Sequence, residues 1–159
     1  MSLRSTDRLG WLDACEQIRQ LASRYAVAMG DHDVDALAAL FIPEVQVGRD
    51  RFGRDELKLD FARQLEPLGR TILHVTNQVI EVTDPDSATG TVGTRGELEV
   101  GDDWITQLIR YEDIYACIEG QWLFVRRKHR LWYGAPIGVN PLTLPPADWP
   151  KNAVGLGDL

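Results

Sequence analysis

The sequence predicts a single α+β domain, in which a cone-shaped, curved antiparallel sheet wraps on N-terminal helices. Two observations predict this class. Apolar residues recur every three or four positions before Thr71, as in amphipathic helices, and every second position after it, as in strands. The length of 159 residues fits one domain with one core. A bent sheet wrapped on helices leaves one end open, and such a cone is suited to hold a small molecule.

Three helices are expected in the first half of the chain. Residues 11–29 carry their apolar side chains on one face of a helix. A short second helix is expected over residues 33–41, because Asp33 is a good N-cap and Pro43 stops a helix. A third amphipathic helix is expected over residues 54–68.

Four long strands are expected in the second half, separated by short turns that contain Asp, Gly or Pro. Their ranges are 71–82, 88–99, 104–117 and 122–133. Strands joined by such short turns form an antiparallel meander. A short additional strand is expected around residues 45–47.

The end of the chain is a proline-rich extension. Residues 135–159 hold five of the eight prolines, which bar a helix and predict an extended chain. Because this segment also carries several large apolar residues, we expect it to pack on the domain of residues 1–134 or on a neighbouring subunit.

The charge of the chain bounds its partners. Its 17 basic and 24 acidic side chains give a formal net charge of −7. An acidic surface repels phosphate groups, so neither nucleic acid nor an anionic membrane is an expected partner. Residues 126–130 form a basic run, but alternation along a strand divides its charges between two faces. We therefore expect a solvated ion-pair ladder there, with His129 as a member.

No cofactor is expected, neither metal, nicotinamide nor flavin. The three histidines form no HxH or HExxH motif, the two cysteines lack metal-ligand spacing, and no glycine-rich phosphate loop joins a strand to a helix. No apolar run approaches the roughly 20 residues that span a bilayer. Because the N-terminal residues also lack the apolar stretch of a secretory signal, we expect a cytoplasmic protein.

Five segments, in this order, resemble the SnoaL-like group of the nuclear transport factor two-like superfamily. They are Ile18–Tyr25, Asp33–Phe41, His74–Val82, Arg110–Asp113 and Trp122–Arg127. The resemblance covers roughly residues 11–133 and implies a cystatin-like α+β barrel with a pocket for one small hydrophobic molecule. It also implies a homo-oligomer, a dimer or a trimer. The fold hosts many chemistries, so it leaves the activity open.

Within this group, hexachlorocyclohexane dehydrochlorinase and scytalone dehydratase are lyases built on a His–Asp pair. His74 matches their histidine on the first long strand. Their aspartate, at the end of the first helix, falls on Gly30 here, and Asp31 follows one residue later. The arginine that the dehydrochlorinase uses near its fourth strand falls on Ile118.

Two further relatives imply other possible functions. Ketosteroid isomerase implies an oxyanion-holding role for Tyr25, but its aspartate base falls on Arg49, so this type of isomerase is not favoured. The β-subunits of ring-hydroxylating dioxygenases share the scaffold and are structural partners without catalytic residues.

The catalytic candidates are therefore His74 as proton acceptor, Asp31 as the group that orients it, and Tyr25 as hydrogen-bond donor. Each has an ordinary structural alternative. His74 also suits a hydrogen-bonded core position, Asp31 a solvated loop, and Tyr25 plain core packing.

Several polar and aromatic residues are candidates to line the pocket. They are Asn77, Trp104, Tyr111, Asp113 and Trp132. Aromatic residues on strands are also typical of an ordinary core. Tyr111 and Asp113 share one face of an alternating strand, whereas Arg110 and Glu112 share the other.

Two functions stay open at this point. The first is a cofactor-independent lyase, dehydratase, cyclase or isomerase, in which His74 abstracts a proton from a small hydrophobic cyclic molecule. The second is a non-catalytic protein that binds a small ligand or a partner subunit, which the glycine at position 30 favours. The decisive observation is whether a carboxylate reaches the His74 ring.

Overall fold

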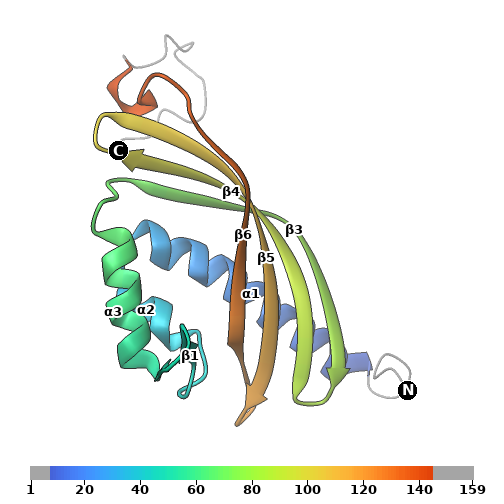
Figure 1. The fold of residues 1–159 in the computed structure, drawn as a ribbon. Helices are drawn as coiled ribbons and strands as arrows, with labels where there is room; N and C mark the ends of the chain where they lie inside the picture. Colours follow the sequence, from blue (N-terminus) through green and yellow to red (C-terminus); the bar gives the residue numbers. More distant parts are fainter. Residues whose placement is uncertain (1–7, 145–159) are drawn as a thin grey trace.

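The computed structural model describes residues 8–144 and has the predicted order of helices followed by long strands (Figure 1). The helices are α1 (Arg8–Gly30), α2 (Val34–Ala39) and α3 (Arg54–Leu65). The long strands are β3 (Thr71–Asp84), β4 (Ser87–Val100), β5 (Asp103–Ile118) and β6 (Gln121–Pro136). The short strands β1 (Gln46–Val47) and β2 (Arg51–Phe52) pair between α2 and α3, and a 3₁₀ turn at Pro141–Thr143 follows β6.

The four long strands form one antiparallel sheet in the order β3-β4-β5-β6. The sheet is strongly curved, and it does not close, because β3 and β6 are its two edges (Figure 1). The α+β prediction is thus confirmed, with an open curved sheet in place of a closed barrel. No helix of the described residues is long and apolar enough to cross a membrane.

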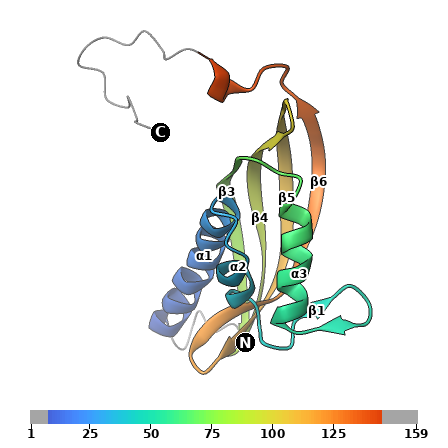
Figure 2. The same cartoon turned by 90° about the vertical axis from the view of Figure 1, so that its left-hand side faces the viewer.

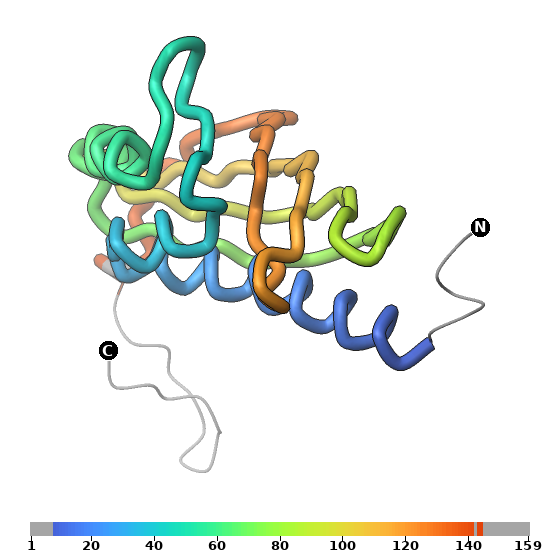
Figure 3. Tube along the Cα trace, turned by 90° about the horizontal axis from the view of Figure 1, so that it is seen from below, coloured from blue at the N-terminus to red at the C-terminus, as the bar shows by residue number. Residues whose placement is uncertain are grey.

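All three helices lie on the same side of the sheet (Figure 2). In the view from below, α1 runs under the strands as a separate layer (Figure 3). We call the side of the sheet that faces the helices the inner face, and the opposite side the outer face.

The predicted helical patterns explain how the helices pack. α1 contributes one stripe of buried side chains at three- and four-residue spacing, namely Ala14, Cys15, Ile18, Leu21, Ala22, Tyr25 and Ala28. This stripe places Tyr25 of α1 against the sheet.

α2 is capped as expected, because the Asp33 carboxylate accepts a hydrogen bond of 2.9 Å from the backbone N–H of Ala36.

Alternation along the strands sorts side chains between the two faces. On β5, Tyr111, Asp113 and Tyr115 are buried on the inner face, whereas Arg110 and Ile114 are exposed on the outer face. Bulges interrupt this alternation, since the register shifts once within the body of β3 and twice between β5 and β6. Each bulge moves the following side chains to the opposite face and adds to the bend of the sheet.

Gly90 on β4 is a position where a side chain has no room. A Cβ atom there would lie 2.6 Å from the carbonyl oxygen of Val79 and 3.3 Å from the Tyr115 ring. Glycine thus lets the large Tyr115 ring lie directly over β4, next to the polar residues described below.

Candidate functional site

The inner face holds a buried ion pair between Arg127 on β6 and Asp113 on β5. The two residues are register partners, so their side chains leave the sheet side by side. Arg127 Nε lies 3.1 Å from Asp113 Oδ1, and Arg127 Nη2 lies 3.1 Å from Asp113 Oδ2. The two side chains are only 4% and 0% exposed, respectively. This two-point geometry is the strongest way for a guanidinium to hold a carboxylate.

Aromatic rings surround the Arg127 guanidinium. Its central carbon lies 4.4 Å from the centre of the Tyr25 ring, 4.1 Å from Tyr111 and 4.5 Å from Phe124. The negative faces of aromatic rings attract a cation, and this attraction is larger where water is excluded. The rings therefore offset part of the desolvation of the charge.

Asp113 is held from a second side by Tyr115, whose hydroxyl donates a 2.9 Å hydrogen bond to Oδ2. Burial raises the pKa of the Asp113 carboxyl, while the charge of Arg127 and the hydrogen bonds from Arg127 and Tyr115 oppose that rise. Because arginine does not lose its proton in proteins, the carboxylate stays paired with a permanent cation. The pair is thus a fixed, oriented dipole inside the domain.

Tyr25 and Tyr111 add two neutral hydroxyl groups to this cluster. Their rings meet edge to face, with centres 5.8 Å apart. Burial raises the pKa of Tyr25 and the pKa of Tyr111 above the usual tyrosine value. Both side chains therefore keep their protons, and because the two hydroxyls also hydrogen-bond to each other, one proton of the pair is free to donate to a ligand.

His129 lies on the same face two residues further along β6, opposite Tyr111. Its ring centre lies 5.5 Å from that of Tyr111, at an interplanar angle of 44°. Partial burial, and then the positive charge of Arg127, lower the pKa of His129, which favours the neutral imidazole. The expected ion-pair ladder forms between Arg130 and Glu112, 2.7 Å apart, but His129 is not part of it.

Next to this cluster, the inner face is apolar and only partly covered. Met29, Leu68, Leu73 and Val75 are partly buried against the core. On β6, Leu131 follows His129 on the same face and is 49% exposed. Polar groups at the edge of an apolar surface are the usual composition of a small-molecule site.

His74 lies outside this cluster. It pairs with Arg95 in the β3–β4 register and is exposed, whereas its neighbours Leu73 and Val75 are turned toward the core. The structure therefore places His74 on the outer face, away from Tyr25, Tyr111 and Asp113. The reason is the two-residue period of a strand, in which a shift by one residue moves a side chain to the opposite face.

The other sequence candidates divide into two groups. Tyr25, Tyr111 and Asp113 come together on the inner face, as described above. Asp31 is exposed in the turn after α1, at a groove between α1 and α2 on the surface of the helices. It is not placed against His74, so the structure does not form the expected His–Asp pair.

Gly30, the position that matches the aspartate of the related lyases, is tightly placed. A Cβ atom there would lie 3.2 Å from the carbonyl oxygen of Thr71, so even a small side chain would press on the start of β3. The nearby His32 ring lies in the turn after α1, with Nε2 3.3 Å from Thr71 Oγ1.

The remaining pocket candidates lie on the outer face. Asn77 and Trp132 line a shallow outer groove of about 380 Å³, and Trp132 is 66% exposed. Trp104 is buried, but its indole N–H donates a 2.8 Å hydrogen bond to Glu97, which alternation also places on the outer face. These three residues therefore do not line the inner face.

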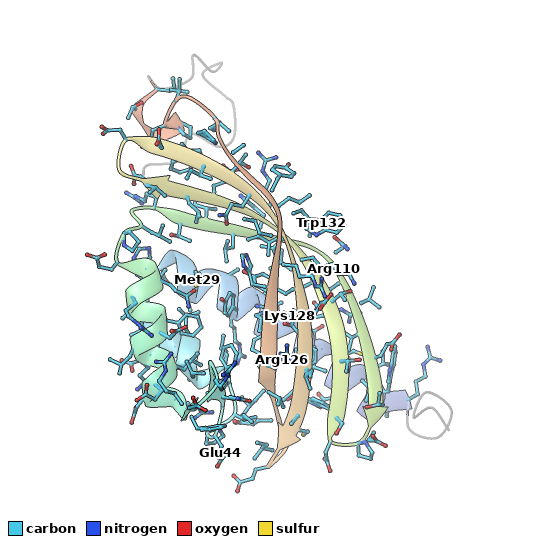
Figure 4. All side chains as sticks on the ribbon, viewed as in Figure 1. Met29, Glu44, Arg110, Arg126, Lys128 and Trp132 are labelled. Carbon is cyan, nitrogen blue, oxygen red and sulfur yellow. The ribbon has the colours of Figure 1, made fainter. Side chains whose placement is uncertain are left out.

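A larger outer groove, of about 550 Å³, lies beside the first and shares Thr91 and Arg110 with it. Figure 4 shows Arg110 and Trp132 on this side of the sheet, with Arg126 and Lys128 along β6. Arg110 and Lys128 both line the larger groove together with Glu81 and Glu112, so its charges are mixed. Within residues 8–144, no group of three or more potential metal ligands comes together.

Arg127 and His129 are the functional candidates that sequence reasoning missed. Simple alternation from the buried Phe124 assigns Arg126 and Lys128 to the inner face. The register shifts by one residue after Phe124, so that Arg127 and His129 face inward instead. A bulge of this kind leaves no clear signal in the sequence, although a basic run within a strand marks the segment.

A family model described as a SnoaL-like domain matches residues 11–128. No protein with a curated description matches the chain.

Solved structures share the fold. Hexachlorocyclohexane dehydrochlorinase LinA-type3 from Novosphingobium barchaimii LL02 is 21% identical, with a TM-score of 0.74 over 88% of this chain and 100% of that one. A proposed scytalone dehydratase from Novosphingobium aromaticivorans is 21% identical, with a TM-score of 0.69 over 82% and 92%. A protein of unknown function from Mycobacterium tuberculosis is 23% identical, with a TM-score of 0.66 over 76% and 77%.

Proposed function

The chain belongs to the SnoaL-like domain family, and from this premise we propose that it is a cofactor-independent lyase, dehydratase, cyclase or isomerase. Its substrate is a small hydrophobic cyclic molecule bound on the inner face. The observation that carries the proposal is the group of neutral tyrosine hydroxyls and a buried cation at the edge of a partly exposed apolar surface.

This chemistry suits reactions that begin with transfer of a proton from the substrate to a base, and the neutral His129 imidazole is the acceptor that the inner face supplies. Negative charge then develops on the substrate, and hydrogen-bond donors fixed in a dry site stabilise it. The hydrogen-bonded Tyr25 and Tyr111 hydroxyls supply such a donor, and Arg127 adds positive potential beside both rings. The Asp113 carboxylate holds Arg127 in place, so its role is positioning.

The first test is conversion of cyclic substrates. The panel includes hexachlorocyclohexane and scytalone, the compounds in the names of two structural relatives. We expect at least one compound to lose hydrogen chloride or water, measured as chloride release or by mass spectrometry. Tyr111→Phe should reduce the rate about 10²-fold if the hydroxyl stabilises the transition state. His74→Gln is the matched control and should retain the rate.

The second candidate function is a non-catalytic binding protein. It is favoured by the ion-pair geometry, because no histidine pairs with a carboxylate among residues 8–144. If the panel compounds bind on the inner face and none is converted under any tested condition, the binding function is supported in place of the enzyme.

A homo-oligomer, a dimer or a trimer, is also proposed. The outer face carries several large exposed apolar side chains, namely Ile72, Val79, Leu108, Ile114, Trp132 and Tyr133. Several large apolar side chains exposed on one face are typical of association sites in soluble proteins. Light scattering after size exclusion should give a mass of two or three chains, and Val79→Glu should lower it. A monomer at high concentration would contradict the proposal.

A further inference from the structure

The three histidines have different surroundings. His74 is exposed on the outer face, and the His32 ring lies beside Thr71 in the turn after α1. His129 stands on the inner face, against Tyr111. Among the described residues, it is therefore the histidine of the sheet whose side chain is exposed on the inner face.

The His129 ring nitrogens are not occupied by neighbouring side chains. Within residues 8–144, neither nitrogen makes a hydrogen bond, and the contact with Tyr111 is between ring and ring. A neutral imidazole has one nitrogen that donates and one that accepts. Because the side chain is only partly buried, a ligand can approach the accepting nitrogen from solvent.

The surroundings of His129 also favour the neutral imidazole, the form that has an accepting nitrogen. The charged and titratable groups that act on it, among the described residues, are Arg127 on its own strand and Tyr111 on β5. Burial and the Arg127 cation lower the pKa of His129 below its ordinary value of about 6.5. Tyr111 keeps its proton, so no negative charge is present there to favour the imidazolium.

We infer that His129 determines the substrate class of the proposed inner-face site: it accepts a hydrogen bond from the hydroxyl group of a phenol- or enol-type ring molecule. The ligand ring lies against the apolar side of the inner face, next to Leu131 and Tyr111. The inference rests on the proposed function, because it assumes that ligands bind on this face, and it adds which functional group the ligand carries.

The test compares two ring probes that differ in one donor. 4-Fluorophenol carries a hydroxyl group, and 4-fluoroanisole carries a methoxy group in its place. Dissociation constants are measured for both by ¹⁹F NMR titration of the full chain at pH 7.5, where a phenol with a pKa near 10 is neutral. A hydrogen bond of typical strength should favour the phenol by about three- to tenfold.

Three variants locate the acceptor. His129→Phe should remove the preference for the phenol, whereas His129→Gln should keep part of it, because the glutamine carbonyl also accepts a hydrogen bond. His74→Phe, the matched exposed histidine, should leave the preference unchanged. In the unsubstituted chain the preference should also fall as the pH drops through the pKa of His129, because the imidazolium has no free acceptor.

The outcomes separate the inference from the function on which it rests. If both probes bind equally and shift the Met29 methyl signal, the inner face binds ligands but the role of His129 is overturned. An unchanged preference in His129→Phe overturns it as well. If neither probe binds, or if binding leaves the Met29 signal in place, both the inference and the inner-face function are overturned.

Discussion

At the scale of single residues, the Arg127–Asp113 pair is the feature on which the inner face depends. Its two hydrogen bonds of 3.1 Å join two almost fully buried side chains. A buried pair is not in itself strong evidence of stability, because desolvation opposes the attraction of the charges. Removing one partner is different, since the other charge then stays buried without compensation.

We therefore predict that Asp113→Asn destabilises the domain by about 3–5 kcal/mol. The free energy of unfolding is measured by urea denaturation. The double variant Arg127→Met/Asp113→Leu is the control, and it should lose less stability than the sum of the single variants Arg127→Met and Asp113→Leu. A loss below about 1 kcal/mol in Asp113→Asn would show that the pair is open to water.

For His74, in contrast to Asp113, we predict that substitution has almost no effect on stability. Because its side chain is exposed on the outer face, His74→Gln should change the free energy of unfolding by no more than about 0.5 kcal/mol. It should also leave ligand binding on the inner face unchanged. A clear loss of binding in this variant, with the fold intact by circular dichroism, would restore the role that the sequence suggested.

The candidate site could be predicted from the sequence only in part. Tyr111 and Asp113 are correctly assigned to one face, because β5 alternates without interruption between them. Arg127 and His129 could not be placed, because the shift after Phe124 reverses the alternation on β6. His74 matches a family motif by its neighbours. A motif match does not determine on which face of the sheet a side chain lies, because a shift by one residue along the strand moves the side chain to the opposite face.

At the scale of secondary-structure elements, the sequence carries most of the information. The change of period at Thr71 locates the boundary between helices and strands, and Asp33 marks the start of α2. The observed ends differ by a few residues, as for α1, which begins at Arg8. Such differences are expected, because residues at the ends of a helix contribute little to the buried apolar stripe from which its bounds are predicted.

Gly90 links strand β4 to the site. Gly90→Ala places a Cβ atom 2.6 Å from the backbone oxygen of Val79, which cannot move without disturbing the β3–β4 pairing. We predict a loss of about 1–3 kcal/mol, measured by thermal and urea unfolding. Gly134→Ala on β6 is the matched control, because its nearest neighbour atom would be at 3.6 Å. Equal stability of the two variants would contradict this account.

Glu99 connects β4 to the segment after β6. The Arg70 backbone N–H donates a 3.0 Å hydrogen bond to Glu99 Oε2, and the Asn140 amide donates one of 2.7 Å to Oε1. These bonds, with the Arg70 bond first, lower the pKa of Glu99. The pKa of Glu99 is therefore lower in the folded chain than its value of about 4.3 in the unfolded chain. The stabilisation by these contacts is fully present above about pH 4.3, and it is lost as the pH falls through the pKa of the folded chain.

The attachment of Asn140 should therefore weaken in acid. We predict that the Asn140 side-chain amide signals in NMR move toward free values below about pH 4. In Glu99→Gln the same signals should not change with pH over that range. Unchanged Asn140 signals in the parent chain at low pH would show that Glu99 does not hold this segment.

At the scale of the whole molecule, the open sheet leaves two surfaces with different character. The outer face carries exposed apolar side chains and shallow grooves of mixed charge. The inner face combines a buried polar cluster with a partly covered apolar surface between the sheet and the helices. The curvature and the fold class were predictable from the order of elements. Which side chains lie on which face of the sheet could be assigned only once the positions of the bulges were known.

The segment of residues 135–159 is proposed to pack on the domain or on a neighbouring subunit. Within the described residues, the backbone N–H of Ile137 continues the pairing with β5, by a 2.9 Å bond to the Trp104 carbonyl. Truncation after residue 144 tests the remainder, residues 145–159, which lie outside the described part. We expect a lower melting temperature or a smaller oligomer, and no change in either would refute the proposal.

The most direct test of the central claim, that ligands bind on the inner face, uses Met29. The chain has two methionines, Met1 and Met29, and Met29 packs on the core from the end of α1 (Figure 4). The ¹³C-methyl signals of both are followed by NMR while 4-fluorophenol is added. We predict that the Met29 signal and the His129 ring signals shift together, while the His74 signals stay in place. Shifts of His74 with a silent Met29 would contradict it and place the site on the outer face.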